Sequence, residues 1–179
     1  MAKTPQKAIF LDRDGTLIEE VDFLSRVEDL RLFPFTKQAL ELLKENGFQL
    51  FVITNQSGIG RGLYGETEMH EIHDRMQIEL GGMIDAFYFC PHLPDAGCEC
   101  RKPKLKMINE ARDSFGVDIP NSWVVGDKLL DVQTARAAGM SAVMVRTGYG
   151  KVHESLLEFK PELIEDNLLA AAIAITSRK

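Results

Sequence analysis

The chain has 179 residues, of which 45% are hydrophobic and 27% are charged, and its formal net charge is −6. This length and composition are typical of one globular domain and exclude a disordered chain. The acidic balance argues against a nucleic-acid binder, and the apolar stretch near the amino terminus is too short for a secretory signal or a membrane span. We therefore expect a cytoplasmic protein without nucleic-acid or membrane partners, a single domain over residues 1–179 and, given its small size, a monomer.

Strand and helix patterns alternate along the chain. Short apolar runs, most of them rich in β-branched or aromatic residues, predict buried strands at 7–12, 49–54, 85–90, 122–127 and 141–146. Amphipathic patterns predict helices at 36–47, 66–80, 104–116 and 128–139, and an apolar run predicts a terminal helix around 170–175. This alternation predicts an α/β fold, a Rossmann-like three-layer α/β/α arrangement with a central parallel sheet. Ligands of such sheets bind beyond the carboxyl ends of the strands.

Two aspartates, Asp12 and Asp14, stand where the first predicted strand ends, in the stretch DRDGT. Neighbouring carboxylates repel each other unless a cation lies between them or one carries a proton. A hard cation such as Mg²⁺ would resolve the repulsion, so that Asp12 could attack an electrophile while Asp14 donates a proton to a leaving group. The alternative is an ordinary turn, in which Asp14 and Gly15 only suit the backbone.

Other polar side chains are predicted at the same edge of the sheet. Thr54 and Asn55 stand at the end of the second strand, Asp127 ends the fourth strand, Asp131 comes one helical turn later, and RKP contributes Lys102. Because the carboxyl ends of parallel strands share one edge, these residues would bring acids, a hydroxyl donor and a cation into one site.

In order and spacing, DRDGT, TN, the lysine of RKP and GDKLLD resemble the four motifs of the haloacid dehalogenase (HAD) superfamily, and the likeness covers nearly the whole chain. The resemblance implies a phosphatase in which Asp12 is the nucleophile that becomes an aspartyl-phosphate. Asp14 would be the general acid and base. Thr54 and Lys102 would hold the transferring phosphoryl group. The physics of phosphoryl transfer agrees, since the protein mainly positions groups and stabilises charge.

The resemblance also implies a magnesium site. Mg²⁺ would be bound by the Asp12 carboxylate, the Asp14 backbone carbonyl and Asp127, with Asp131 at or just outside its shell. No segment between motifs is long enough for a cap domain, so short loops would contact a sugar phosphate substrate. We expect those contacts from Glu20, Asp22, Phe23, Asn55, Gln56, Ser57, Arg101 and Lys128. Arg101 could hold a second phosphate or a sugar hydroxyl with its planar fork, or be a solvated surface arginine.

All three cysteines fall within eleven residues, in the stretch CPHLPDAGCEC. Cys90, His92, Cys98 and Cys100 have C-x-H-x5-C-x-C spacing, which suits a closed tetrahedral Zn²⁺ shell and therefore a structural metal in a loop over 90–100. Disulfides fit a reducing cytosol poorly, whereas buried or incidental thiols remain an alternative. Because RKP follows directly, a zinc loop would also fix this segment beside the active site.

The zinc loop is similar to that of a zinc-containing branch of the superfamily, which includes phosphatases of a heptose bisphosphate and of histidinol phosphate. TNQSGIGRG, GDKLLDVQTARAAGM and VRTGYG look closer to the heptose branch, which implies hydrolysis of the C7 phosphate of D-glycero-D-manno-heptose 1,7-bisphosphate, a step toward ADP-heptose and lipopolysaccharide core. Two departures keep histidinol phosphate as the alternative. The first is KLKM after RKP, which looks more like the histidinol-phosphate branch. The second is that LIEEVDFLS lacks the Asn and Gly-Tyr usual in the heptose branch.

Competing interpretations fit less well. The glycines of SGIGRG lack the spacing and the position of a dinucleotide fingerprint, and a nucleotide-binding switch would need a phosphate-gripping motif. A zinc-stabilised binding module that has lost catalysis predicts decay of a catalytic position, and none is seen. His70 and His73 lie in a Glu- and Asp-rich helix pattern, and we expect both on a solvated face.

Overall fold

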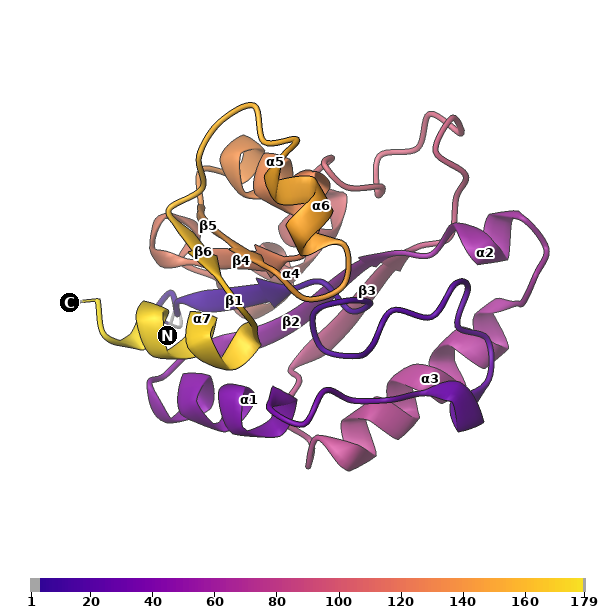
Figure 1. The fold of residues 1–179 in the computed structure, drawn as a ribbon, viewed down its shortest axis with the longest axis horizontal. Coiled ribbons are helices and arrows are strands. Elements are labelled where there is room, and N and C mark those ends of the chain that lie inside the picture. Colours follow the sequence, from indigo (N-terminus) through magenta and orange to yellow (C-terminus); the bar gives the residue numbers. More distant parts are fainter. Residues whose placement is uncertain (1–3, 179) are drawn as a thin grey trace.

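The computed structural model describes residues 4–178, in which six parallel strands form one sheet in the order β3-β2-β1-β4-β5-β6 (Figure 1). The strands are β1 (Ala8–Leu11), β2 (Gln49–Asn55), β3 (Ala86–Cys90), β4 (Trp123–Gly126), β5 (Ser141–Val145) and β6 (Leu163–Glu165). This is the predicted Rossmann-like sheet. β6 was not predicted, because three half-buried residues are too few to show a hydrophobic period.

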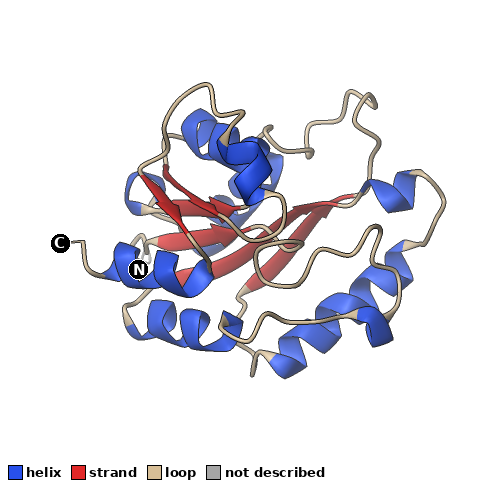
Figure 2. Ribbon diagram, in the orientation of Figure 1, coloured by secondary structure: helices blue, strands red, loops and turns tan. Residues whose placement is uncertain are grey.

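Helices cover both faces of the sheet (Figure 2). One face carries α1 (Thr36–Glu45), α3 (Glu66–Glu79) and α7 (Leu168–Thr176), and the other carries α4 (Lys106–Phe115) and α5 (Leu129–Ala138). The sequence predicted these five helices to within two residues at each end. It missed two helices of one turn or little more, α2 (Ser57–Gly60) and α6 (Gly150–Glu154), and two 3-10 turns, Val27–Asp29 and Ile119–Asn121.

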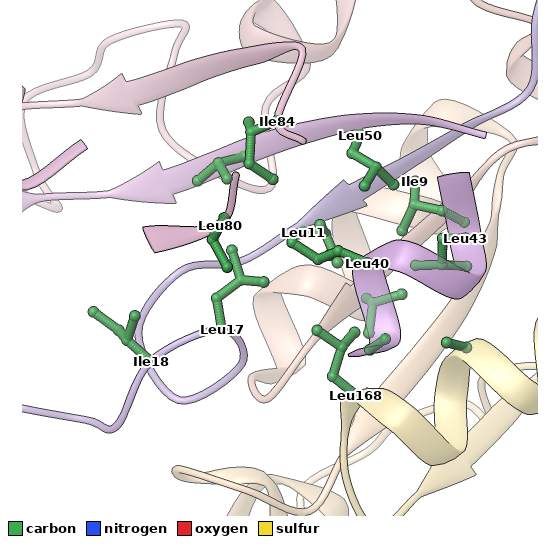
Figure 3. Packing of buried hydrophobic residues seen from close by; sticks show 14 of the residues in the cluster. Ile9, Leu11, Leu17, Ile18, Leu40, Leu43, Leu50, Leu80, Ile84 and Leu168 are labelled. Carbon is green, nitrogen blue, oxygen red and sulfur yellow. The ribbon is translucent and has the colours of Figure 1, made fainter. Parts of the chain in front are cut away.

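The core is built by alternation along fully buried strands. In β1, Ile9 and Leu11 face the layer of α1 and α7, where Leu40, Leu43 and Leu168 pack beneath them (Figure 3). Phe10 faces the layer of α4 and α5. Because helices cover both faces of the sheet, the central strands are apolar throughout.

The strand order reverses at β1, which lies between β2 and β4. Pairing continues past the end of β1, where the Asp12 backbone N–H donates to the Val125 carbonyl at 2.9 Å, so the chain leaves the sheet at a defined point. Among the described residues, the connection from β1 to α1 holds only the 3-10 turn Val27–Asp29 and no cap domain. No helix within residues 4–178 combines the length and apolar character needed to span a membrane.

Candidate active site

Asp12 leaves β1 beside a buried lysine. Lys102 Nζ donates to Asp12 Oδ1 at 2.9 Å and to Asp131 Oδ1 at 2.6 Å, and Lys102 is only 4% exposed. Burial opposes ionisation of Asp12, but the charges of Lys102 and Lys128 outweigh it and hold the pKa of this carboxyl below its ordinary value. Asp12 is therefore an anion, the form in which a carboxylate can act as a nucleophile.

Asp12, Asp127 and Asp131 form a cluster that could hold a metal ion. Each offers a carboxylate oxygen, and these oxygens all lie within 4.8 Å of one another. Asp127 Oδ2 accepts from the Tyr149 N–H at 2.8 Å, whereas its buried Oδ1 accepts no hydrogen bond from any residue in 4–178. Burial and then the charge of Asp12 raise the pKa of Asp127 to about 8. An unsatisfied buried oxygen beside a second carboxylate is a donor set that fits Mg²⁺.

Two glycines allow the chain to approach Asp127. Gly15 and Gly148 have φ angles of +80° and +52°, and a side chain at either position would collide with the Asp127 carboxylate. The Thr147 hydroxyl donates to the Gly15 carbonyl at 2.6 Å and joins the two loops. The backbone therefore packs closely around the carboxylate whose Oδ1 accepts no hydrogen bond from the described residues.

Asp14 lies between two pockets. A pocket of 130 Å³ is lined by Asp12, Asp14, Thr54, Lys102 and other residues. A second pocket of 180 Å³ also borders Asp14 and extends toward the loop after β1. A group at this boundary can contact both a phosphoryl group in the first pocket and the remainder of a substrate in the second.

The second pocket brings together seven of the eight residues predicted for substrate binding: Glu20, Asp22, Phe23, Asn55, Gln56, Ser57 and Lys128. The eighth, Arg101, lines the first pocket. Lys128 Nζ lies 3.2 Å from Glu20 Oε2, so this pocket holds an ion pair. Phe23 is 46% exposed and has a φ of +54°, a conformation that is uncommon for a bulky residue and concentrates at functional sites.

Asn55 and Gln56 use their amides within the protein. Asn55 Oδ1 accepts from the Lys102 N–H at 3.0 Å, and Asn55 Nδ2 donates to the Lys102 carbonyl at 3.4 Å. Gln56 Nε2 donates to Asp14 Oδ2 and to Thr54 Oγ1, both at 2.7 Å, and Gln56 Oε1 accepts from the Tyr64 hydroxyl at 2.7 Å. These contacts favour positioning roles for both side chains.

The predicted zinc ligands converge in the loop after β3. His92 Nδ1 lies 3.5 Å from Cys90 Sγ and 3.2 Å from Cys100 Sγ, and Cys90 Sγ lies 3.6 Å from Cys98 Sγ. A tetrahedral zinc with Zn–S bonds of about 2.3 Å would separate its sulfur ligands by roughly 3.8 Å, so the spacing fits such an ion. Arg101 Nη1 donates to the His92 carbonyl at 3.2 Å, which links the loop to the active site.

The residues behind Asp14 were not predicted from the sequence. Arg13 is fully buried, and its guanidinium donates to Asp14 Oδ2 at 3.0 Å and Oδ1 at 3.1 Å. The expectation for His73 was wrong: it is 4% exposed and stacks on Phe87, because the acidic residues of α3 occupy the opposite face. His70 is exposed, as expected. For Arg13, the sequence signal that could have been used is an arginine directly after a predicted apolar strand.

Comparisons with known proteins agree with this geometry. A model of the HAD-hydrolase-like family matches residues 99–171. The D-glycero-beta-D-manno-heptose-1,7-bisphosphate 7-phosphatase of Pseudomonas aeruginosa is 37% identical over 173 residues, which are 93% of this chain and 96% of that protein. A protein of Thermoplasma acidophilum, a probable D-glycero-D-manno-heptose-1,7-bisphosphate 7-phosphatase, is 41% identical over 138 residues, 75% of this chain and 86% of its own length.

A solved structure shows the same fold. The D,D-heptose 1,7-bisphosphate phosphatase of B. bronchiseptica, complexed with magnesium and phosphate, superposes with a TM-score of 0.88 at 34% identity, covering 94% of this chain and 97% of that chain. The predicted superfamily is thus confirmed by sequence and by structure. The chain belongs to the D-glycero-D-manno-heptose-1,7-bisphosphate 7-phosphatase family of HAD-like hydrolases.

Proposed function

We propose that this chain is a Mg²⁺-dependent phosphatase that hydrolyses the C7 phosphate of D-glycero-D-manno-heptose 1,7-bisphosphate through an aspartyl-phosphate at Asp12. One observation carries the proposal. An ionised Asp12, paired with Lys102, shares a small polar pocket with Asp14, which also borders the larger pocket where a leaving group would lie. The names of the relatives support the choice of substrate.

In the first step, a carboxylate oxygen of Asp12 attacks phosphorus and the bond from phosphorus to the ester oxygen breaks. The ester oxygen takes a proton from Asp14 and leaves as the alcohol. Thr54 Oγ1 accepts from Gln56, so its hydroxyl hydrogen is available for a phosphoryl oxygen. Lys102 supplies positive charge to the same pocket.

In the second step, water attacks the phosphorus of the aspartyl-phosphate and gives a proton to Asp14. The bond from phosphorus to the Asp12 oxygen breaks, which releases orthophosphate and restores both carboxyl groups to their starting states. One water is consumed, and one alcohol and one phosphate are formed. Two easier displacements thus replace one difficult hydrolysis.

Asp12, Asp127 and the Asp14 backbone carbonyl would hold Mg²⁺, with Asp131 beside them. The unsatisfied Asp127 Oδ1 supports this assignment. When bound, the ion neutralises charge on the phosphoryl oxygens and lets the anionic Asp12 approach an anionic phosphate.

We also propose a structural Zn²⁺ held by Cys90, His92, Cys98 and Cys100, supported by the spacing of their ligand atoms. All three cysteines are free, which suits a reducing compartment such as the cytoplasm. We expect a monomer of 20.1 kDa, and light scattering of the purified protein measures its mass.

The test is a phosphate-release assay on heptose bisphosphate and histidinol phosphate in parallel, with and without Mg²⁺. We expect release from the heptose bisphosphate to need Mg²⁺ and to fall by about a thousandfold or more in Asp12→Asn, which removes the nucleophile. Mass spectrometry of acid-quenched enzyme should place one phosphoryl group on Asp12. The matched control is Asp113→Asn, since Asp113 is an exposed aspartate on α4.

Each unfavourable result has a distinct meaning. A preference for histidinol phosphate overturns the substrate, while activity retained by Asp12→Asn overturns the nucleophile. Equal inactivity of the wild-type protein and Asp12→Asn on a broad panel of phosphoesters supports the catalytically inactive binding module instead.

A further inference from the structure

Behind Asp14 lies a buried group of residues that the proposed reaction does not use: Arg13, Tyr64, Met69 and His73. The Arg13 side chain has no exposed surface, although a charged residue is almost never fully buried without a partner. Its Nη1 donates to Met69 Sδ at 3.1 Å and lies 3.5 Å from His73 Nε2, both on α3. The guanidinium is therefore anchored to a helix and directed at Asp14.

The guanidinium contacts Asp14 in a specific way. Nε donates to Asp14 Oδ2 at 3.0 Å and Nη2 donates to Oδ1 at 3.1 Å, which is the bidentate geometry that only arginine provides. Gln56 Nε2 adds a second bond to Oδ2 at 2.7 Å, and the Tyr64 hydroxyl holds the other end of Gln56. The Asp14 carboxylate is thus fixed from two directions.

A carboxyl group has about four lone-pair positions, two on each oxygen, and in the acid form one of them carries the proton. Arg13 and Gln56 occupy both positions on Oδ2, and Arg13 occupies one on Oδ1. The remaining position is on Oδ1. We propose that Arg13 is a positioning residue for the general acid, fixing Asp14 so that Oδ1 gives the proton to the leaving alcohol and takes one back from water.

This inference rests on the proposed function and goes beyond it, because it states which reaction step Arg13 serves. A general acid matters for an alkyl ester, whose alkoxide is a poor leaving group. It matters little for an aryl ester such as 4-nitrophenyl phosphate, whose phenolate leaves without a proton. Since kcat/KM covers the steps up to release of the alcohol, the ratio of the two kcat/KM values isolates the acid step.

The experiment compares Arg13→Lys with the wild-type protein on heptose bisphosphate and on a series of aryl phosphates, in the presence of Mg²⁺. Lysine keeps the charge but loses the planar fork. We expect kcat/KM to fall by about a hundredfold for the sugar ester and by less than about threefold for the aryl esters. Asp14→Asn should also lose more kcat/KM on the sugar ester than on the aryl esters. The control is Arg75→Lys, because Arg75 is an exposed arginine on α3 paired with Glu79, and it should lose no kcat/KM on either class of ester.

The ratio is measured on one preparation, so partial misfolding of Arg13→Lys cancels. Tyr64→Phe provides a second variant: it keeps the ring, releases Gln56, and should shift the ratio in the same direction by a smaller factor. Equal losses on both classes of ester in these two variants, or no loss in either, overturn the positioning role. If the wild-type protein cleaves no sugar ester, or Asp14→Asn loses no more kcat/KM on the sugar ester than on the aryl esters, the proposed function fails instead.

Discussion

At the scale of single residues, the buried charges of the site differ in how well their neighbours balance them. Lys102 lies between Asp12 and Asp131, and both contacts are hydrogen bonds. A buried ion without such a partner costs several kcal/mol, so this pairing stabilises the charges of Lys102 and Asp12, whereas burial raises the pKa of Asp131. Asp127 is the exception, with one oxygen unsatisfied and its pKa raised to about 8. The Asp127 Oδ1 atom, where we place the metal, has Lys128 Nζ 3.6 Å away but accepts no hydrogen bond from the described residues.

Gly15 and Gly47 form a matched pair for a test of close packing. Their φ angles are +80° and +79°, but a Cβ at Gly47 would meet open space, whereas a Cβ at Gly15 would collide with Asp127. We expect Gly47→Ala to cost roughly 1–2 kcal/mol of unfolding free energy and to leave kcat unchanged. Gly15→Ala should carry the same backbone strain, displace Asp127, and lower kcat by about a hundredfold. Urea unfolding and steady-state kinetics measure the two effects, and equal kcat values in both variants would contradict this reading.

At the scale of elements, α3 and β3 together bury a histidine. His73 of α3 stacks on Phe87 of β3 with ring centroids 4.6 Å apart, next to Arg13. Burial and then the charges of Arg13 and His70 lower the pKa of His73 to about 3. The His73 imidazole is therefore neutral in the folded protein near neutral pH.

This histidine makes stability depend on pH. Between about pH 3 and 6.5 the unfolded chain binds a proton at His73 and the folded protein does not, so the unfolding free energy falls as pH drops through this window. His73→Gln retains a hydrogen-bond acceptor for Arg13 but cannot take up a proton. We therefore expect its unfolding free energy to fall by a few kcal/mol less than that of the wild type across this pH window. Urea unfolding of both proteins across the window measures the difference. His70→Gln is the matched control and should keep most of the wild-type pH dependence, since burial is the main cause of the lowered pKa of His73. A His73→Gln curve parallel to the wild type would exclude the buried neutral imidazole.

The zinc loop gives a second prediction for an element. Lys102 follows the loop directly, so a disordered loop would displace the Lys102 ammonium. The contacts of Asn55 with the Lys102 backbone limit this displacement but do not replace the loop. We expect Cys100→Ser to lose the bound zinc, to lower the melting temperature, and to reduce kcat/KM by about tenfold or more. Elemental analysis, thermal melting and kinetics measure these effects. Glu99→Ser, an adjacent loop residue with an exposed ion pair, should keep its zinc; zinc bound fully by Cys100→Ser would contradict the ligand set.

At the scale of the whole molecule, magnesium binding should appear as stability. A ligand that binds only the folded state adds about 2.7 kcal/mol of unfolding free energy at a hundred times its Kd. We expect the unfolding free energy of the wild-type protein to rise with Mg²⁺ concentration in this way. Asp127→Asn should be more stable than the wild type without Mg²⁺ near neutral pH, because it removes a buried carboxyl group whose pKa is raised, and it should gain little from the ion. Thermal melts of both proteins with and without Mg²⁺ measure this stabilisation. Equal stabilisation of the wild type and Asp127→Asn would exclude Asp127 as a ligand.

Much of this architecture follows from local patterns. Five of the six strands and the five long helices show their periods within short windows, and Asp12, Thr54 and Asp127 can be placed because each stands at the carboxyl end of an apolar strand. Parallel strands align their carboxyl ends, so these residues meet without any knowledge of detailed packing. The four residues that we propose as zinc ligands are close in sequence, so their spacing alone predicts their convergence.

Packing between distant segments decided the rest. Arg13 is anchored by Met69 and His73, which are 56 and 60 positions away, and no pattern near DRDGT indicates which helix covers it. The approach of Gly15 to Gly148 depends on how two loops fold over the same strand ends. The sequence by itself determined the strand ends, the acidic and cationic residues placed there, and the zinc motif, because these depend on local period and spacing. Only the tertiary structure decided how Asp14 is held and which oxygen of Asp127 lacks a partner, because those contacts arise when remote side chains exclude water together.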